Sequence, residues 1–250
     1  MEPDEPPAQG TGPEGADPAT REQRNRDSRE EAERGGEGAG PSEWGGSGQV
    51  GVGPWPGDRP TGEHYDPELL EHGDTRNVVD PYRYWRREAV AADLARRAHP
   101  FHVAIENFGH DHNIGTVVRT ANAFGAAGVH IVGRRRWNRR GAMVTDRYLD
   151  VHHHEDVAGL LAFAAAHGLA VVAVDNTPGA QRLETADLPR DCVLLFGQEG
   201  PGVTDDAHAA AALTVSIAQF GSTRSINAGV AAGIAMHAWV RQHADLDTAW

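Results

Sequence analysis

The chain has 250 residues, enough for one well-packed domain with tails, and a formal net charge of −13. Residues 1–78 hold 18 Asp and Glu against 7 Arg, whereas the remainder holds 18 against 16. The acidity therefore does not exclude a nucleic-acid partner for the C-terminal part. The single cysteine, Cys192, excludes an internal disulfide and a multi-thiolate metal site. Without a signal peptide or an apolar run near the ~20 residues of a membrane span, a cytoplasmic protein is expected.

Residues 1–78 are predicted to form a disordered acidic tail. They are rich in Gly, Pro, Glu, Asp and Ser, and their apolar residues are too sparse to offset the loss of chain entropy on folding. Trp44 and Trp55 are isolated exceptions, which we interpret as solvated linker aromatics. The expected role of this tail is to keep the protein soluble.

Residues 79–99 are predicted to form an Arg-rich helical arm. Asp80 is an N-cap candidate and Pro81 suits the first helical position, so a helix is expected over 82–97. Its arginines lie near aromatic residues, a combination that suits RNA phosphates and bases. A solvated helix face explains the same pattern, and the two interpretations remain open.

Strands and helices alternate from residue 100 to residue 244. Apolar runs predict strands at 101–106, 128–132, 170–175, 193–196 and 213–217. Helical patterns are expected at 113–124, 156–167, 204–212 and 225–242. This order predicts an α/β domain with a mostly parallel sheet covered by helices on both faces. Periodicity alone would give an ordinary doubly wound fold, since chain knots are nearly absent from proteins.

Three short motifs lie where ligands of α/β enzymes bind. Asn113 opens the helix that carries Arg119, and Gly197–Gly202 follows a buried strand with the sequence GQEGPG. This loop is not the dinucleotide fingerprint G-x-G-x-x-G, which disfavours a nucleotide-dependent oxidoreductase. Ser225-Ile226-Asn227 opens the last helix, where side chains commonly cap orphan amides.

Together these motifs resemble the SpoU (TrmH) family of RNA ribose 2′-O-methyltransferases. The family elements N-x-G-x-x-x-R-x-A, G-x-E-x-x-G and S-L-N occur here in the family order, with Ile226 in place of the usual Leu. The resemblance covers roughly residues 100–242. It implies a C-terminal trefoil knot, S-adenosylmethionine as cofactor, and methyl transfer to a ribose 2′-OH in tRNA or rRNA. It also implies a homodimer in which the motif Arg of one subunit completes the site of the other.

The resemblance also assigns roles to individual residues. Arg119 is the expected catalytic group, because a guanidinium beside a ribose hydroxyl favours the alkoxide, with a substrate phosphate as a possible proton acceptor. Asn113 and Ser225 could equally be helix caps. The implied catalytic set is Arg119, Asn113, Glu199, Ser225 and Asn227. The expected cofactor contacts, chiefly through main-chain groups, are Gly197, Ile217, Ile226, Asn176, Leu195 and Gln219.

A cluster of arginines lies in the loop 133–150 of a chain that has no lysine. It is the strongest candidate for a phosphate-binding patch, and RNA rather than DNA is the expected partner. Its members are Arg134, Arg135, Arg136, Arg139 and Arg140. The run His152–Glu155 suggests a metal, but adjacent residues do not easily face one ion and methyl transfer needs none. No metal site is therefore expected.

A catalytically silent RNA-binding or assembly module of the same fold is the alternative. Its site residues would be free to change, whereas Arg119, Glu199, Ser225 and Asn227 are all present. The sequence therefore favours the enzyme over the silent module.

Overall fold

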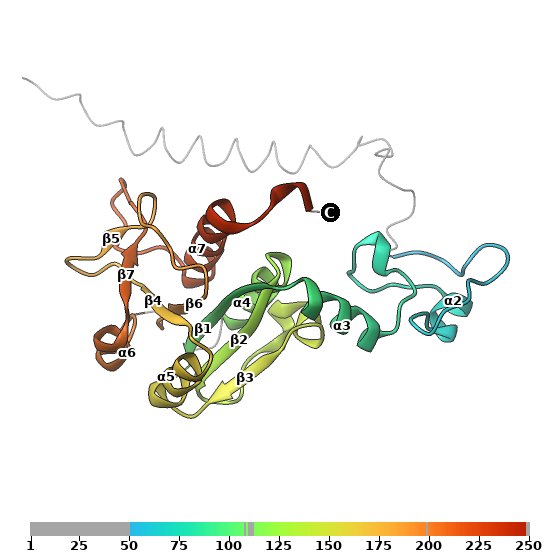
Figure 1. Cartoon of the computed structure of the whole chain (residues 1–250), viewed down its shortest axis with the longest axis horizontal. Helices are drawn as coiled ribbons and strands as arrows, with labels where there is room; N and C mark the ends of the chain where they lie inside the picture. The colour runs from blue at the N-terminus through green and yellow to red at the C-terminus, as the bar shows by residue number, and fades with distance from the viewer. Residues whose placement is uncertain (1–50, 108, 110–112, 199, 249–250) are drawn as a thin grey trace, which may run out of the picture. The chain divides into compact units, whose positions relative to one another are not determined.

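The computed structural model describes residues 51–107, 109, 113–198 and 200–248 (Figure 1). Its centre is a seven-stranded sheet with the order β3-β2-β1-β6-β4-β7-β5, and every neighbouring pair is parallel. The strands are β1 (His99–Asn107), β2 (Ala126–Gly133), β3 (Val151–His154), β4 (Ala170–Val174), β5 (Gln181–Arg182), β6 (Cys192–Phe196) and β7 (Leu213–Ser216). The predicted α/β fold with a mostly parallel sheet is confirmed.

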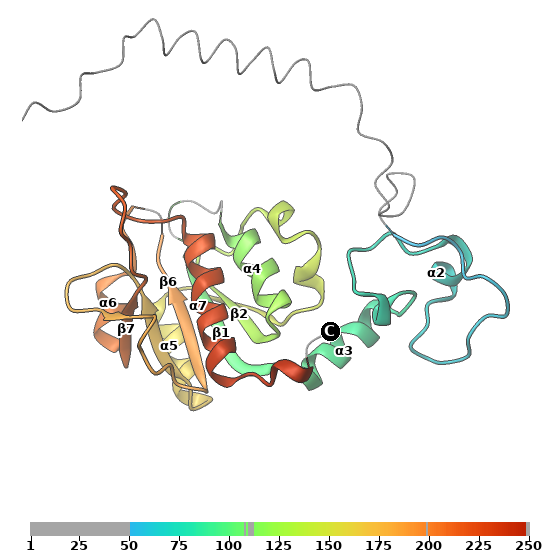
Figure 2. The same ribbon diagram turned by 90° about the horizontal axis from the view of Figure 1, so that it is seen from above.

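Helices cover both faces of this sheet (Figure 2). The α-helices are α2 (Pro67–His72), α3 (Arg87–Arg97), α4 (Ile114–Ala123), α5 (Val157–Ala166), α6 (Asp205–Ala210) and α7 (Ala228–His243). Short 3₁₀ turns are η1 (Asp80–Tyr82), η2 (Arg139–Ala142), η3 (Thr145–Arg147) and η4 (Leu246–Thr248). Helices α4 and α7 share one apolar core with the sheet, and α5 and α6 share a second core on the other face.

Strand β6 explains how one strand serves both cores. All five of its residues are buried, as expected for a strand in the interior of a parallel sheet. Cys192, Leu194 and Phe196 face the core under α4 and α7, while Val193 and Leu195 face the core under α5 and α6. This alternation follows from the two-residue period of a strand. Burial raises the pKa of the Cys192 thiol to about 12, consistent with an inert core side chain.

Helix α7 is fixed to the sheet by Trp239. Its indole is fully buried, lies 4.4 Å from the ring of Phe101, and donates to the carbonyls of Pro189 (3.2 Å) and Arg190 (3.1 Å). At its first turn, α7 comes so close to α4 that a Cβ on Gly229 would lie 3.1 Å from a methyl carbon of Thr116. The first turns of α4 and α7 are thereby held side by side.

The expectation of disorder over residues 1–78 is wrong for 51–78, while residues 1–50, including Trp44, lie outside the described residues. Within 51–78 the buried carboxylate of Asp74 accepts hydrogen bonds from the Arg76 guanidinium (2.7 Å) and the Tyr84 amide (2.9 Å). Burial by itself would raise the pKa of Asp74, but these bonds outweigh it and hold the pKa below its ordinary value. Trp55 packs edge-on against Tyr84, at 5.2 Å between ring centroids, and so is not isolated.

The arm differs from the predicted helix at its start. Helix α3 begins at Arg87 rather than at residue 82, because Tyr84 has a left-handed φ of 64° that interrupts the helix. The Tyr84 hydroxyl donates to the Gly53 carbonyl (2.7 Å), and Trp85 forms a β-bridge with Tyr65. Contacts with distant residues therefore override the local helical pattern.

Strands β3 and β5 are additions to the predicted elements. Both are short strands at the edges of the sheet, where few apolar residues mark them. The other predicted strands and helices of residues 100–244 are present with shifts of a few residues at their ends. Across the described ranges, none of the helices combines the length and the apolarity needed to span a bilayer.

Candidate active site

The motifs meet at the carboxyl edge of the sheet. Strands β1, β6, β4 and β7 are consecutive neighbours and run parallel, so their C-terminal ends lie at one edge. Asn107, Gly197, Asp175 and Ile217 stand at or directly after these four ends. This is the edge at which open α/β sheets bind ligands.

The loop after β6 is closed so tightly that it excludes side chains at two of its positions, Gly197 and Gly202. Gln198 and Gly202 exchange two main-chain hydrogen bonds of 3.1 Å, and a Cβ on Gly197 would lie 2.0 Å from the Gly202 carbonyl carbon. Gly202 has a φ of 78°, which L-residues rarely adopt. Glycine is therefore required at both positions.

Asp175, at the end of β4, supports this loop. Its carboxylate accepts from the Val203 amide (2.9 Å) and from Nε2 of His208 (3.1 Å). A Cβ on Gly202 would come within 2.6 Å of the same carboxylate. Asp175 thus fixes the position of the loop, a role that its place at a strand end did not reveal.

A buried carboxylate at the end of β1 was not predicted. Glu106 is 1% exposed and accepts from the Thr204 hydroxyl (2.6 Å) and amide (3.1 Å) at the start of α6. Burial raises the pKa of Glu106 above its usual range, although the bonds from Thr204 act in the opposite direction. Its place in an apolar run was the available signal, because a carboxylate there must find partners.

The first and third motifs are joined by one hydrogen bond. Asn227 caps α7, since its Oδ1 accepts from the amides of Gly229 (3.0 Å) and Val230 (3.2 Å). Its Nδ2 donates to Oδ1 of Asn113 at 2.9 Å. Asn113 occupies the N-cap position of α4, but its side chain makes no capping bond to the amides of that helix.

Arg119 extends from the exposed face of α4. The apolar side of that helix, which contains Val117 and Val118, is buried in the core. The guanidinium is exposed, and within the described part of the chain it has no hydrogen bond or ion pair. Its positive charge is therefore available to an external ligand.

The loop between β7 and α7 is fastened at both ends. The Ala218 amide donates to Glu184 (2.9 Å), and the Asn176 side chain donates to the Arg224 carbonyl (3.0 Å). Between these anchors, Oε1 of Gln219 is buried and has no hydrogen-bond partner among the described residues. A donor from a bound ligand would satisfy this oxygen.

The remaining predicted site residues differ in how accessible their side chains are at the carboxyl edge of the sheet. Ile217 and Ile226 are half-buried at the two ends of the same loop. Ser225 is exposed and does not cap α7, because the N-cap of that helix is Asn227. Leu195 is fully buried inside β6, so its side chain is not brought to the site. Glu199 lies outside the described residues.

All five arginines of the predicted phosphate patch are exposed. The loop that carries them is held by Asn107, whose buried amide donates to the carbonyls of Arg134 (2.6 Å) and Arg136 (3.1 Å). Arg139 pairs with Asp146 at 3.3 Å, and the Arg134 guanidinium donates to the Gly109 carbonyl at 3.0 Å. The side chains left for phosphate contacts are Arg135, Arg136 and Arg140.

The arginines of the helical arm are less available for phosphate contacts than those of the loop. Arg87 pairs with Glu88 at 3.1 Å, and Arg97 lies 3.9 Å from a carboxylate oxygen of Asp93, which also pairs with Arg96. Arg86 donates to the Tyr65 carbonyl at 2.9 Å. The two carboxylates Glu88 and Asp93 thus offset part of the positive charge of these four arginines, which favours a solvated helix face over an RNA-contacting one.

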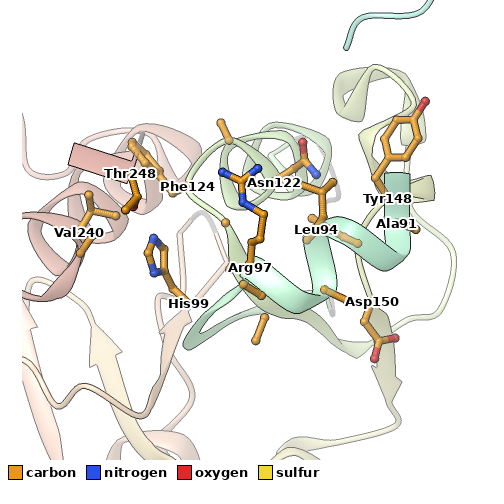
Figure 3. Close-up of a pocket in the computed structure, with 18 of the residues that line it drawn as sticks. Ala91, Leu94, Arg97, His99, Asn122, Phe124, Tyr148, Asp150, Val240 and Thr248 are labelled. Atoms are coloured by element: carbon orange, nitrogen blue, oxygen red, sulfur yellow. The ribbon is translucent and has the colours of Figure 1, made fainter. Parts of the chain in front are cut away.

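Two other features lie away from this edge. A cavity of about 810 Å³ lies near the amino-terminal ends of β1 and β2, lined by α3 and the end of α7, and includes none of the motif residues (Figure 3). The described residues contain no group of three or more His, Cys, Asp or Glu side chains arranged to hold a metal. His152 and His154 instead pack against the buried His130.

Comparisons with known proteins agree with this geometry. The model of the SpoU rRNA Methylase family matches residues 100–237, more than half of the chain. A tRNA (guanosine(18)-2′-O)-methyltransferase of Escherichia coli K12 is 29% identical over 167 residues, which cover 66% of this chain and 72% of that protein.

Two solved structures share the fold. The TrmH/SpoU tRNA modifying enzyme of A. aeolicus has a TM-score of 0.56 at 22% identity, covering 63% of this chain and 82% of its own. An AdoMet-bound rRNA methyltransferase from Sinorhizobium meliloti has a TM-score of 0.52 at 27% identity, covering 59% of each chain. The family-model match over residues 100–237, together with the motifs assembled at one sheet edge, shows that the chain belongs to the SpoU rRNA methylase family.

Proposed function

We propose that this protein transfers a methyl group from S-adenosylmethionine to a ribose 2′-oxygen of tRNA or rRNA. The observation that carries the proposal is the hydrogen bond between Asn113 and Asn227, 2.9 Å long, which joins the helix of Arg119 to the helix that follows the β7 loop. Two motifs more than a hundred residues apart thereby form one site. The relatives named for tRNA 2′-O-methylation support the same reaction.

The residues at this edge fit the cofactor. Gly197 and Gly202 carry no side chain, so a flat adenine ring can approach the backbone of the turn at these positions. The partnerless Oε1 of Gln219 offers an acceptor at the same edge. When bound, S-adenosylmethionine supplies an electrophilic methyl group. Gly197, Ile217, Gln219 and Ile226 would hold it, with Asn176 acting through the loop that it fastens.

The chain's own contribution to the chemistry is electrostatic. A ribose hydroxyl loses its proton only with difficulty near neutral pH, so a nearby positive charge favours its nucleophilic form. The free guanidinium of Arg119 supplies that charge, and a phosphate of the substrate accepts the proton. Asn113 and Asn227 keep the two helices aligned, Ser225 lies in the same motif, and Glu199 is assigned by motif alone.

We further propose a homodimer, a C-terminal knot and a cytoplasmic location. Exposed apolar side chains support the dimer: Val230 and Ile234 lie one turn apart on α7, and Met143 and Val144 lie beside η2, which packs on α4. Such residues are typical of a subunit contact. The knot follows from family membership, and the location from the RNA substrate.

Transfer from S-[methyl-³H]adenosylmethionine to separate tRNA and rRNA fractions tests the reaction. A 2′-O-methyl group blocks alkaline cleavage of the neighbouring phosphodiester, so the label should appear in alkali-resistant dinucleotides. Label in mononucleotides would indicate base methylation and reject the proposal. Calorimetry with S-adenosylmethionine tests the alternative of a catalytically silent RNA-binding or assembly module. A protein that binds no S-adenosylmethionine would favour that alternative.

A further inference from the structure

Phe220 is exposed to an extent that is unusual for an aromatic residue. Its side chain is 99% exposed, far beyond the other large apolar side chains of the described residues, of which Leu246 follows at 63%. A ring that is not buried within its own chain has both faces available for an external contact, and aromatic faces stack well on other flat groups.

The loop that carries Phe220 is held by hydrogen bonds on both sides of this residue. Ala218 is held by Glu184 and the Arg224 carbonyl by Asn176, so five residues lie between the two anchors. A Cβ on Gly221 would meet nothing within 4 Å, which places the tip of the loop in open space. Phe220 thus stands at a fastened tip that leads directly into Ser225 and Asn227.

The surroundings of the ring decide what it contacts. Residues 221–225 are all exposed, and they read Gly-Ser-Thr-Arg-Ser, with hydroxyls and one guanidinium. A subunit interface would need a broader apolar surface, which lies instead at Val230 and Ile234. A single aromatic ring among polar donors fits an unstacked base with its sugar and phosphate.

We infer that Phe220 is a stacking platform for an RNA base at or beside the methylated nucleotide. The inference rests on the proposed function, which requires one ribose to leave the regular stack and enter this edge. A base on Phe220 would hold the strand while the exposed polar groups of the loop meet its backbone. The partner is thus a single-stranded or everted nucleotide, and the contact is largely independent of the base identity.

Kinetics with aromatic and non-aromatic replacements test this. Alanine replacement of a stacking ring typically costs roughly 1 to 3 kcal/mol, so Phe220→Ala should lower kcat/KM for the methylated RNA fraction roughly 5- to 150-fold. Binding of S-adenosylmethionine and the oligomeric state should not change. Phe220→Trp should retain activity and Phe220→Leu should behave like the alanine variant, with Leu246→Ala as the matched control. A fully active Phe220→Leu protein would overturn the inference.

Cross-linking separates this inference from the proposed function. With p-benzoylphenylalanine in place of Phe220, ultraviolet light should attach the protein to tRNA or rRNA, whereas the same replacement at Leu246 should not. This readout does not need methyl transfer, so an inactive wild-type protein would reject the proposed reaction without deciding the role of the ring. Attachment to a second protein chain, or to neither, would overturn the role of Phe220.

Discussion

Arg119 is the residue whose replacement tests the chemistry most directly. Its guanidinium is exposed, and the opposite face of α4 supplies the packing, so Arg119→Ala should preserve the fold. Losing one charge aimed at a developing alkoxide typically lowers the rate roughly 10²- to 10³-fold. Transfer of labelled methyl groups measures the rate, calorimetry measures cofactor affinity, and Arg241→Ala on α7 is the control. Full activity of Arg119→Ala would reject its catalytic role.

Asn227 offers a pair of replacements that separates its two roles. Asn227→Asp keeps an oxygen to cap Gly229 and Val230 but loses the donor to Asn113. It should unfold near the wild-type temperature yet transfer methyl groups more slowly. Asn227→Ala loses both functions and should also cost about 1 kcal/mol of stability. Thermal denaturation measures stability, and methyl transfer measures the rate. If Asn227→Asp were as active as the wild type, the only role of Asn227 would be to cap α7.

At the scale of elements, the arginine loop is predicted to dock RNA through phosphates. Changing Arg135, Arg136 and Arg140 together to Ala should weaken RNA binding and flatten the log–log salt dependence by about 0.7 to 0.9 per lost contact. The matched control changes the paired arginines Arg59, Arg87 and Arg96, which alters the net charge equally. Filter binding at several salt concentrations measures both variants. Identical slopes for the two triple variants would remove the loop from the RNA-binding surface.

The sequence predicts the elements that are set by local pattern, and it fails where distant contacts decide. The stripe of Ile114, Val117 and Val118 identifies α4 because burial on one helix face has a fixed period. Residues 51–78 were misjudged because their order depends on contacts such as Asp74 with Tyr84, which composition does not show.

The same distinction between local pattern and distant contacts applies to the candidate site. Motif positions such as Arg119 and Asn227 can be identified from the sequence because given residue types occur there at a fixed spacing. Asp175, Glu106 and Asn107 were missed as supports because each acts on a loop whose path depends on the assembled sheet.

Taken as a whole, the molecule should lose stability in acid because of a chain of histidines centred on the fully buried His130. Nε2 of His130 lies 3.0 Å from Nδ1 of His102, and Nδ1 of His130 lies 2.9 Å from Nε2 of His154. Burial, followed by the neighbouring imidazoles, lowers the pKa of His102 to about 4 and that of His130 to about 2. Phe163 and His167 of the α5 side also face His130. The carboxylate of Asp150 acts on His102 and pairs with His152, and that of Asp156 acts on His154.

The direction of this pH dependence follows from the unfolded chain, in which these histidines regain their ordinary pKa of 6.5. Below pH 6.5 the unfolded state binds protons that the folded state does not bind. The free energy of unfolding therefore falls as the pH is lowered toward 4 for His102 and toward 2 for His130. His130 alone should contribute about 1.4 kcal/mol per pH unit in this window. Urea unfolding between pH 7.5 and 5 should show a steeper decline for the wild type than for His130→Phe, with His237→Phe as control. Parallel declines would contradict the prediction.

A shared active site is the second prediction for the whole molecule. Co-expressed chains with Arg119→Ala and Gly197→Trp should form heterodimers in which one interface pairs an intact Arg119 with an intact cofactor loop. Such heterodimers, purified through two different tags, should regain part of the activity that each variant lacks. Verified heterodimers with no more activity than either homodimer would place each site within one subunit.

Strand order also has a consequence for synthesis of the chain. Within the sheet, the β3-β2-β1 and β4-β7-β5 groups are joined by β6, which begins at Cys192. Until β6 is inserted, β1 and β4 each present an open edge to other nascent chains. A pause in translation before β6, when β7 has not yet been made, should therefore leave the open edge of the β3-β2-β1 group and an unpaired β4 prone to intermolecular pairing. A chaperone would act most usefully in that interval.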